Sequence, residues 1–363
     1  MGSRAFFFFF IFLCVSFSFR VCECGALVPA IYVFGDSLVD VGNNNHLKLS
    51  LAKANFPHNG IDFPTTKPTG RFSNGKNAAD YLAEKVGLPT SPPYLSLVSK
   101  FRKITNTTPF KTGVSFASGG AGIFNETNNL FKQSVAMGQQ IDFYSSVYQH
   151  LVEELGSSAA QVHLSKSLFT VVIGSNDIFG YHESSDLRKK YSPQQYVDLM
   201  ASTLESQLKR LYSYGARKYV IGGVGLVGCT PSQRKRSRTG ECDAEVNSWV
   251  EHYNFGLKAM LGRLKMELNG IAFSYFDAYA VMSNFIRTPS SYGFTEIRRA
   301  CCGLGNLNAD VPCLPIAAFC SNRNDHLFWD LYHPTQEAHR LFGNYIFDGP
   351  FTYALNVKQL IAL

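Results

Sequence analysis

Four short segments, far apart in the chain, carry the groups that serine ester hydrolysis needs. Residues 34–38 contain the hydroxyl of Ser37, and residues 330–334 contain an acid–histidine pair, Asp330 and His333. Residues 118–122 offer the backbone N–H of Gly119 or of Gly120. Of these two donors we favour Gly119. Residues 174–177 offer the side-chain amide of Asn176. A hydroxyl is a weak nucleophile until a base takes its proton, and the tetrahedral intermediate needs fixed donors. The four segments together predict acyl transfer at Ser37.

Each motif also has a structural interpretation. A serine that follows a strand is often a helix cap or a turn residue, and His333 could cap the helix that Pro334 is expected to begin. Asp330, three residues earlier, can instead accept the imidazole N–H and leave the second nitrogen facing a serine. The Gly-x-Ser-x-Gly elbow of α/β-hydrolases does not occur, so that fold is not expected.

Five apolar, β-rich runs can position these groups. They cover residues 30–34, 113–117, 168–173, 218–221 and 271–276. Runs that are continuously apolar predict a parallel sheet covered on both faces. The carboxyl ends of such strands share one rim, where ligands bind. Three of the four chemical motifs follow directly after a predicted strand, so they are expected to converge on that rim.

Amphipathic helical patterns fill the intervals between these strands. They cover residues 77–86, 141–155, 196–211, 246–268 and 336–345. Strands that alternate with helices predict a three-layer α/β/α sandwich. No long linker or internal repeat is present, and residues 27–363 are expected to form a single domain.

The first 26 residues have the pattern of a secretory signal, with Arg4 before an apolar run and small residues before position 27. The alternative, a membrane anchor, needs about twenty apolar residues, and this run is shorter. No later stretch is long and apolar enough to span a bilayer. We therefore expect a protein exported to the cell wall or apoplast.

Cysteine content agrees with export. Three of the nine cysteines lie in the predicted signal, and an even number remains. Zinc is the alternative, but the usual Cys-x-x-Cys ligand spacing is absent. We expect one disulfide between Cys229 and Cys242. The other two should join Cys301, Cys302, Cys313 and Cys320, with the adjacent Cys301 and Cys302 bonded to different partners. Asn106 and Asn125 begin glycosylation acceptor motifs.

The formal charge of the chain is +7, and positive residues concentrate at 234–238. A solvated loop is the simpler interpretation of this cluster, and weak attraction to anionic wall polymers or lipid surfaces is the functional one. No nucleic-acid recognition motif is present.

A Gly-x-Gly-x-x-Gly pattern begins at Gly223, but a proline and the basic segment follow it, so no dinucleotide cofactor is expected. Neither a metal nor an organic cofactor is predicted.

The same residues resemble the plant GDSL esterase/lipase family of the SGNH hydrolase superfamily. The resemblance runs through FGDSLVDVGNNN at 34–45, GRFSNG at 70–75, FASGGAG at 116–122 and GSND at 174–177. It continues through GCTP at 228–231, CCG at 301–303 and FWDLYHPT at 328–335. It implies a flavodoxin-like fold, a nucleophile at Ser37, a base at His333 and its orienting acid at Asp330. It also implies oxyanion donors at the Ser37 backbone, Gly119 and Asn176.

These observations predict a secreted serine esterase or lipase that hydrolyses lipids or other acylated plant compounds. A transacylase that uses the same triad, passing the acyl group to an alcohol, is an alternative. A non-catalytic wall- or lipid-binding protein is the third hypothesis, and the complete set of catalytic groups argues against it.

Overall fold

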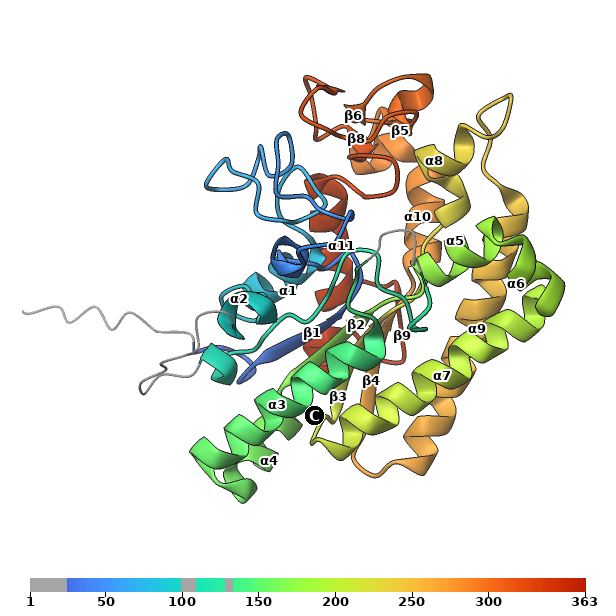
Figure 1. Cartoon of the computed structure of the whole chain (residues 1–363). Coiled ribbons are helices and arrows are strands. Elements are labelled where there is room, and N and C mark those ends of the chain that lie inside the picture. The colour runs from blue at the N-terminus through green and yellow to red at the C-terminus, as the bar shows by residue number, and fades with distance from the viewer. Residues whose placement is uncertain (1–24, 99–108, 128–132) are drawn as a thin grey trace, which may run out of the picture.

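The computed structural model describes residues 25–98, 109–127 and 133–363. At its centre lies a five-stranded sheet with the strand order β1-β2-β3-β4-β9 (Figure 1). Strands β1 to β4 run parallel, and β9 is antiparallel to β4. The strands are β1 Ile31–Gly35, β2 Leu168–Val172, β3 Lys218–Gly222, β4 Ala272–Phe276 and β9 Thr352–Tyr353.

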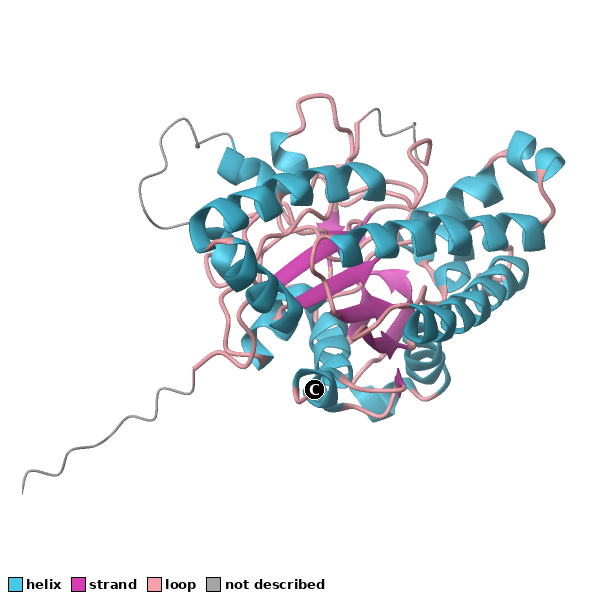
Figure 2. Ribbon diagram, turned by 90° about the horizontal axis from the view of Figure 1, so that it is seen from below, coloured by secondary structure: helices cyan, strands magenta, loops and turns pink. Residues whose placement is uncertain are grey.

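Both faces of the sheet are apolar, which is why the strands read as continuous apolar runs. In β1, Tyr32 and Phe34 point to one hydrophobic cluster, while Ile31 and Val33 point to the other. Helices cover each face, and Figure 2 shows the strands between the two helical layers. The predicted three-layer α/β/α fold with a mostly parallel sheet is therefore confirmed.

The first helical layer packs on the face that carries Tyr32 and Phe34. It consists of α3 Met137–Leu155, α4 Ser157–Lys166, α7 Pro193–Ser213 and α9 Ala244–Glu267. The second layer packs on the face that carries Val33. It consists of α1 Ala78–Lys85, α10 Ala278–Arg287, α11 Gln336–Asp348 and α12 Val357–Ile361. The helix predicted at each of the five amphipathic segments is present.

Shorter elements connect the strands and the two helical layers. The helices are α2 Tyr94–Val98, α5 Ser175–Glu183, α6 Ser185–Lys190 and α8 Pro231–Arg234. Two small sheets pair β5 Glu296–Ala300 with β8 His326–Phe328, and β6 Cys302–Gly303 with β7 Ala318–Phe319. Among the described residues, no helix combines the length and the apolar character needed to cross a bilayer.

The prediction of a strand at residues 113–117 was wrong in part. This segment lies beside β1 and pairs with it in parallel, but only Ser115 forms a bridge, opposite Val33. The ladder is incomplete because side chains take two backbone groups of β1: Ser91 Oγ donates to the carbonyl of Ile31, and Gln140 Oε1 accepts from the N–H of Gly35. The fifth strand is instead the C-terminal β9, which the apolar pattern did not predict.

Three disulfides join the six cysteines that follow residue 228. They pair Cys229 with Cys242, Cys301 with Cys320 and Cys302 with Cys313. The first pair is the expected one, and the adjacent cysteines take different partners, as predicted. The second and third pairs cross-link the segment between β5 and β8, which has little other regular structure, around the buried Trp329.

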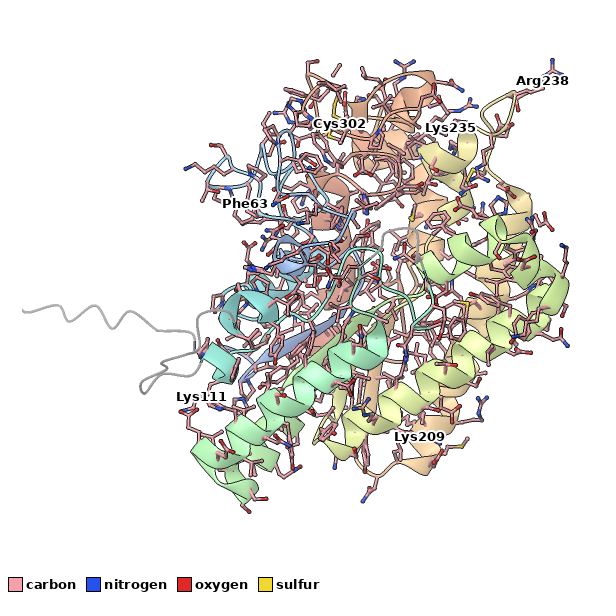
Figure 3. All side chains as sticks on the ribbon, viewed as in Figure 1. Phe63, Lys111, Lys209, Lys235, Arg238 and Cys302 are labelled. Carbon is pink, nitrogen blue, oxygen red and sulfur yellow. A yellow bond between two sulfur atoms is a disulfide. The ribbon has the colours of Figure 1, made fainter. Side chains whose placement is uncertain are left out.

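Most of the basic cluster at 234–238 is held within the fold by hydrogen bonds and ion pairs. Arg234 is buried and donates to the carbonyl oxygens of Cys229 and Gly240. Lys235 and Arg236 form ion pairs with Asp310 and Glu183. Figure 3 shows Arg238 extending outward at one corner of the molecule. The charge that the sequence concentrates in one segment is therefore not a concentrated surface patch.

A buried ion pair fastens the loop at residues 70–75 to α1. Arg71 binds both carboxylate oxygens of Asp80 at 2.7 Å, and the two side chains are 6% and 1% exposed. Burial by itself would raise the pKa of Asp80, but the charge and hydrogen bonds of Arg71 outweigh it, so this pKa lies below its ordinary value. The carboxylate is therefore charged in a nearly dry site and depends on its partner.

We expect Arg71→Ala to lower the free energy of unfolding by about 3–5 kcal/mol, because it leaves a buried charge unpaired. Chemical denaturation monitored by circular dichroism measures this change. The matched control is Lys76→Ala, which breaks the exposed pair between Lys76 and Glu84 and should cost less than about 1 kcal/mol. Equal losses in the two variants would contradict the assignment of a buried, essential pair.

Candidate active site

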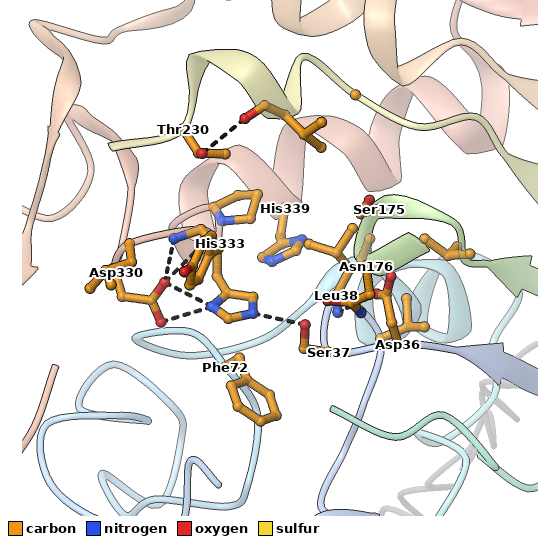
Figure 4. Close-up of a pocket in the computed structure, with 18 of the residues that line it drawn as sticks. Asp36, Ser37, Leu38, Phe72, Ser175, Asn176, Thr230, Asp330, His333 and His339 are labelled. Atoms are coloured by element: carbon orange, nitrogen blue, oxygen red, sulfur yellow. Dashed lines mark hydrogen bonds and ion pairs between the residues drawn. The ribbon is translucent and has the colours of Figure 1, made fainter. Parts of the chain in front are cut away.

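Ser37, His333 and Asp330 form one hydrogen-bonded chain at the carboxyl rim of the sheet (Figure 4). The Nε2 atom of His333 lies 2.8 Å from Ser37 Oγ. The Nδ1 atom of the same ring lies 2.8 Å from each carboxylate oxygen of Asp330. A carboxylate accepts hydrogen bonds, so Nδ1 carries the ring proton and Nε2 is left as the acceptor for the serine hydroxyl. This is the arrangement in which a neutral histidine can take the proton of a nucleophile.

The acid–histidine pair is built by local hydrogen bonds. Asp330 Oδ1 also accepts from the backbone N–H groups of Tyr332 and His333, both at 2.9 Å. One carboxylate therefore shapes the turn and orients the imidazole. The expectation that Pro334 begins the following helix was wrong. Helix α11 begins at Gln336, because the side chain of Thr335 caps it by accepting from the backbone N–H of Ala338.

Ser37 is presented by the end of β1. A Cβ atom on Gly35 would lie 2.3 Å from the carbonyl oxygen of Val172 on β2, so only glycine allows the strands to approach this closely. The side chain of Gln140, on α3, then holds the strand end. Its Oε1 accepts from Gly35 N–H and its Nε2 donates to Gly35 O, both at 2.8 Å. Sequence analysis missed Gln140, which lies more than one hundred residues from the motif that it supports.

The structure does not support Gly119 as an oxyanion donor. Its N–H donates to Asp40 Oδ2 at 3.0 Å, and the same carboxylate accepts from the N–H groups of Gly42 and Asn43. Asp40 thus ties the serine loop to the glycine loop. The residue of the glycine pair that lines the pocket is Gly120, with φ +80°. Sequence reasoning could not see that Asp40 uses the Gly119 N–H.

Asn176 lies at the start of α5 and lines the same pocket as Ser37. One hydrogen of its amide is donated to the carbonyl of Ala121 at 2.8 Å, which fixes the plane of the side chain. The next residue, Asp177, is fully buried and accepts from the N–H groups of Ile123 and Phe124. The predicted oxyanion amide is therefore held against the glycine loop, with one N–H remaining for a ligand.

The loop at residues 70–75 is a part of the site to which sequence analysis gave no role. The ring of Phe72 packs against the imidazole of His333, with centroids 5.0 Å apart. The Oδ1 atom of Asn74 accepts from the first backbone N–H of α11, at Gln336. These contacts support the imidazole of His333 and hold the start of α11, which follows the base, while the ion pair of Arg71 ties the loop to α1. The GRFSNG motif was the available signal, but its contacts are all long-range.

A cavity of about 360 Å³ surrounds the Ser37 hydroxyl. Its outer part is bounded by loop residues on both sides, including Leu51 and Phe56 on one side and Pro312 and Leu314 on the other. The second of these loops contains Cys313, whose disulfide to Cys302 fixes it over the site. Residues of β2, β3 and α11 line the same cavity as Ser37 and His333.

Asp36, the neighbour of the nucleophile, is 1% exposed. Its Oδ1 accepts from the N–H of Leu38 at 3.0 Å, while Oδ2 is buried and has no partner among the described residues. Burial raises the pKa of Asp36 to about 7, and this effect exceeds the opposing influence of the Leu38 hydrogen bond and of His333. The carboxyl group therefore keeps its proton in mildly acidic solution.

We expect Asp36→Asn to stabilise the protein increasingly as pH rises. An unfolded Asp titrates near pH 4, so the folded state binds the extra proton between about pH 4 and pH 7, and the wild type loses stability as pH rises through that range. The neutral amide keeps the acceptor for Leu38 and removes this titration. Denaturation at about pH 4 and about pH 8 measures the difference. The exposed Asp198→Asn is the control, and a difference that does not change with pH would contradict the prediction.

The remaining predicted sites lie away from this pocket. Asn125 is exposed in a turn, while the Thr127 hydroxyl of its acceptor motif donates to Asp177. Asn106 and nearly all of the predicted signal lie outside the described residues. Within the described part of the chain, no group of three or more His, Cys, Asp or Glu side chains is arranged to hold a metal ion.

Comparison with known proteins identifies relatives along nearly the whole chain. Residues 31–346 match the family described as GDSL-like Lipase/Acylhydrolase. The GDSL esterase/lipase At5g55050 of Arabidopsis thaliana is 51% identical over 342 residues, which cover 93% of this chain and 91% of that protein. The GDSL esterase/lipase At5g37690 of the same plant is 38% identical over 318 residues, covering 87% of each chain.

Similar solved structures are more distant. A catalytic mutant of Axe2, an acetylxylan esterase from Geobacillus stearothermophilus, is 12% identical with a TM-score of 0.37, covering 86% of this chain and 90% of that one. So low a score adds nothing to the family relationship.

Proposed function

The chain belongs to the GDSL-like lipase/acylhydrolase family and is a carboxylic ester hydrolase, and we propose that it acts through Ser37, His333 and Asp330. The observation that carries this proposal is the continuous hydrogen-bonded chain from Asp330 through His333 to Ser37 Oγ. We further propose that it is exported after loss of residues 1–26, that residues 27–363 form one catalytic domain, and that its substrates are lipids or other acylated plant compounds.

In the proposed reaction, Ser37 Oγ attacks the ester carbonyl as its proton passes to His333 Nε2. Asp330 holds the ring in the required tautomer and stabilises the imidazolium that forms. His333 then donates the proton to the leaving alcohol oxygen, which releases the alcohol and leaves an acyl group on Ser37. His333 then takes a proton from a water molecule as its oxygen attacks this acyl group. The bond to Ser37 Oγ breaks, His333 returns the proton to Oγ, and the carboxylic acid leaves.

Two donors are proposed to stabilise the oxyanion. One is the backbone N–H of Ser37, for which no described residue is an acceptor. The other is the amide hydrogen of Asn176 that is not donated to Ala121. Donors fixed before the charge develops stabilise the intermediate without reorganising. Gly119 is left out because Asp40 already uses its N–H.

We expect Asn176→Ala to lower kcat by roughly 10²- to 10³-fold with a smaller change in KM, because its donor acts mainly once the oxyanion forms. Steady-state kinetics on a neutral ester measures both constants. The matched control for loss of an amide is Asn284→Ala, because Asn284 lies on α10 and does not line the pocket. A rise in KM with kcat unchanged would make Asn176 a substrate-binding residue instead.

Hydrolysis and transacylation share every step up to the acyl-enzyme and differ in what attacks it. The test is to incubate purified protein with an ester, with and without a primary alcohol, and to quantify free acid and transferred ester by mass spectrometry. Free acid as the main product supports the hydrolase. Predominant transfer at low alcohol concentration would make the protein a transacylase, and no turnover of any ester would overturn the proposal.

A further inference from the structure

The pocket continues beyond Ser37 into a chamber between the sheet and the second helical layer. On the sheet side the chamber is bounded by Thr170 and Val172 of β2 and by Val220 and Gly222 of β3. These residues pair in register, Thr170 with Val220 and Val172 with Gly222, so all four lie on one face. Val172 and Gly222 lie on central strands and are nevertheless only half-buried, because the chamber opens against them.

Helix α11 forms the opposite wall. His339, Phe342 and Ile346 line the chamber, and their spacing places them along one side of the helix. From His339 to Ile346 the helix rises on the order of 10 Å, which sets the approximate depth of the chamber. Met282, on α10, also lines it. Most of the wall is therefore apolar, and it is formed by buried side chains.

Two polar atoms interrupt this apolar lining. Thr170 Oγ1, on the sheet, and His339 Nδ1, on the helix, are buried and have no hydrogen-bond partner among the described residues. The two residues are 4% and 2% exposed. Figure 4 shows His339 in the same pocket as Ser37 and His333. A buried polar group without a partner is costly, so a wall with two such atoms favours an occupant that can hydrogen-bond to them.

We propose that this chamber binds the acyl chain of the substrate, and that Thr170 and His339 select a chain of medium length that carries a hydroxyl group. The inference rests on the proposed function, because it places the ester carbonyl at Ser37. The chamber is walled by the sheet and helices and limits the length of its occupant. The mouth between the loops is left for the alcohol, which must depart before water can attack.

The protonation state of His339 agrees with a neutral occupant. Burial, together with a smaller effect of the nearby His333, lowers the pKa of His339 to about 3. The ring is therefore uncharged at neutral pH and offers one donor and one acceptor nitrogen. A hydroxyl group can satisfy either nitrogen, whereas a carboxylate at the end of the chain would be buried without a cation to balance it.

The first test measures kcat/KM for p-nitrophenyl esters of acetate, octanoate, palmitate and an octanoate that bears a hydroxyl group near the middle of its chain. We expect octanoate to exceed both acetate and palmitate. We expect the hydroxylated chain to exceed octanoate by about tenfold or more, because the wall atoms are otherwise unpaired. Equal rates for octanoate and palmitate, or no preference for the hydroxyl, would overturn the corresponding part of the inference.

Variants then assign the preferences to the chamber. Ile346→Phe fills its deep end and should lower the ratio of octanoate to acetate activity by about tenfold or more. Leu341→Phe, on the same helix but outside the chamber lining, should leave this ratio unchanged. Thr170→Val should bring the ratio of hydroxylated to plain octanoate close to one. Ser274→Ala removes a buried hydroxyl of β4 outside the chamber lining and should leave this ratio unchanged.

A measurement on the unaltered protein covers the case in which a variant fails to fold. A fluorophosphonate with an octyl chain and a terminal diazirine is allowed to react with the protein and is then photolysed. Cross-links to Phe342 or Ile346 are expected, and cross-links to Leu51 or Leu314 would place the chain in the mouth and overturn the inference. If the probe does not modify Ser37 at all, the proposed function itself fails, so the two failures are distinguishable.

Discussion

Replacing Ser37 with alanine is expected to lower kcat for ester hydrolysis by about 10³-fold or more while the protein remains folded. The hydroxyl is the group that bonds to the acyl carbon, and His333 cannot activate water as effectively at that position. The side chain is only half-buried and its hydrogen bond is to His333, so its loss affects packing little. Steady-state kinetics and thermal unfolding of the purified variant measure the two effects.

The matched control is Ser206→Ala, on the exposed side of α7, which should keep wild-type turnover. A fluorophosphonate should label the wild type and this control at Ser37, and should not label the Ser37→Ala variant. Turnover near the wild-type value in the Ser37→Ala variant would refute the proposed nucleophile, whatever the family relationship.

Replacing His333 with alanine is expected to cause a similar loss, about 10³-fold or more in kcat, because the base and the general acid disappear together. Combining this change with Ser37→Ala should cost little more than either change alone, because the two residues act as one unit.

The chain contains its own control for a histidine paired with an aspartate. His326 Nδ1 lies 2.7 Å from Asp325, as His333 does from Asp330, but His326 is not part of the pocket lining. His326→Ala should therefore retain activity and its pH dependence. If both histidine variants lost activity equally, the loss would reflect damage to the region between β5 and α11 rather than removal of the base.

The elements of the fold were predictable to the extent that they depend on local sequence. Strands β1 to β4 are apolar on both faces because helices cover both, and this is visible as continuous apolar runs. The irregular segment around Ser115 and the short antiparallel β9 were not predictable. The pairing of the first is interrupted by the side chains of Ser91 and Gln140, which bind backbone groups of β1 from distant parts of the chain.

The candidate site divides in the same way. Asp330 and His333 are three residues apart, so the geometry of their turn follows from the sequence, and the topology of a parallel sheet brings Ser37 and Asn176 to the same rim. The supporting contacts of Gln140, Asp40 and Phe72 span long separations and have no local signature. The N–H of Gly119, the predicted donor, is bound by a carboxylate from another loop, a contact that the local sequence does not indicate.

The sequence by itself determined which groups are available for chemistry, the class of fold that carries them and the rim where they meet. These properties follow from residue types and from periodicities that each segment carries alone. The tertiary structure alone decided the distances between Ser37, His333 and Asp330, the pairing of Asp40 with Gly119 and the existence of a chamber between β2, β3 and α11. A cavity is the volume that packed layers leave unfilled, and it depends on how side chains from distant segments meet, which no single stretch of sequence specifies.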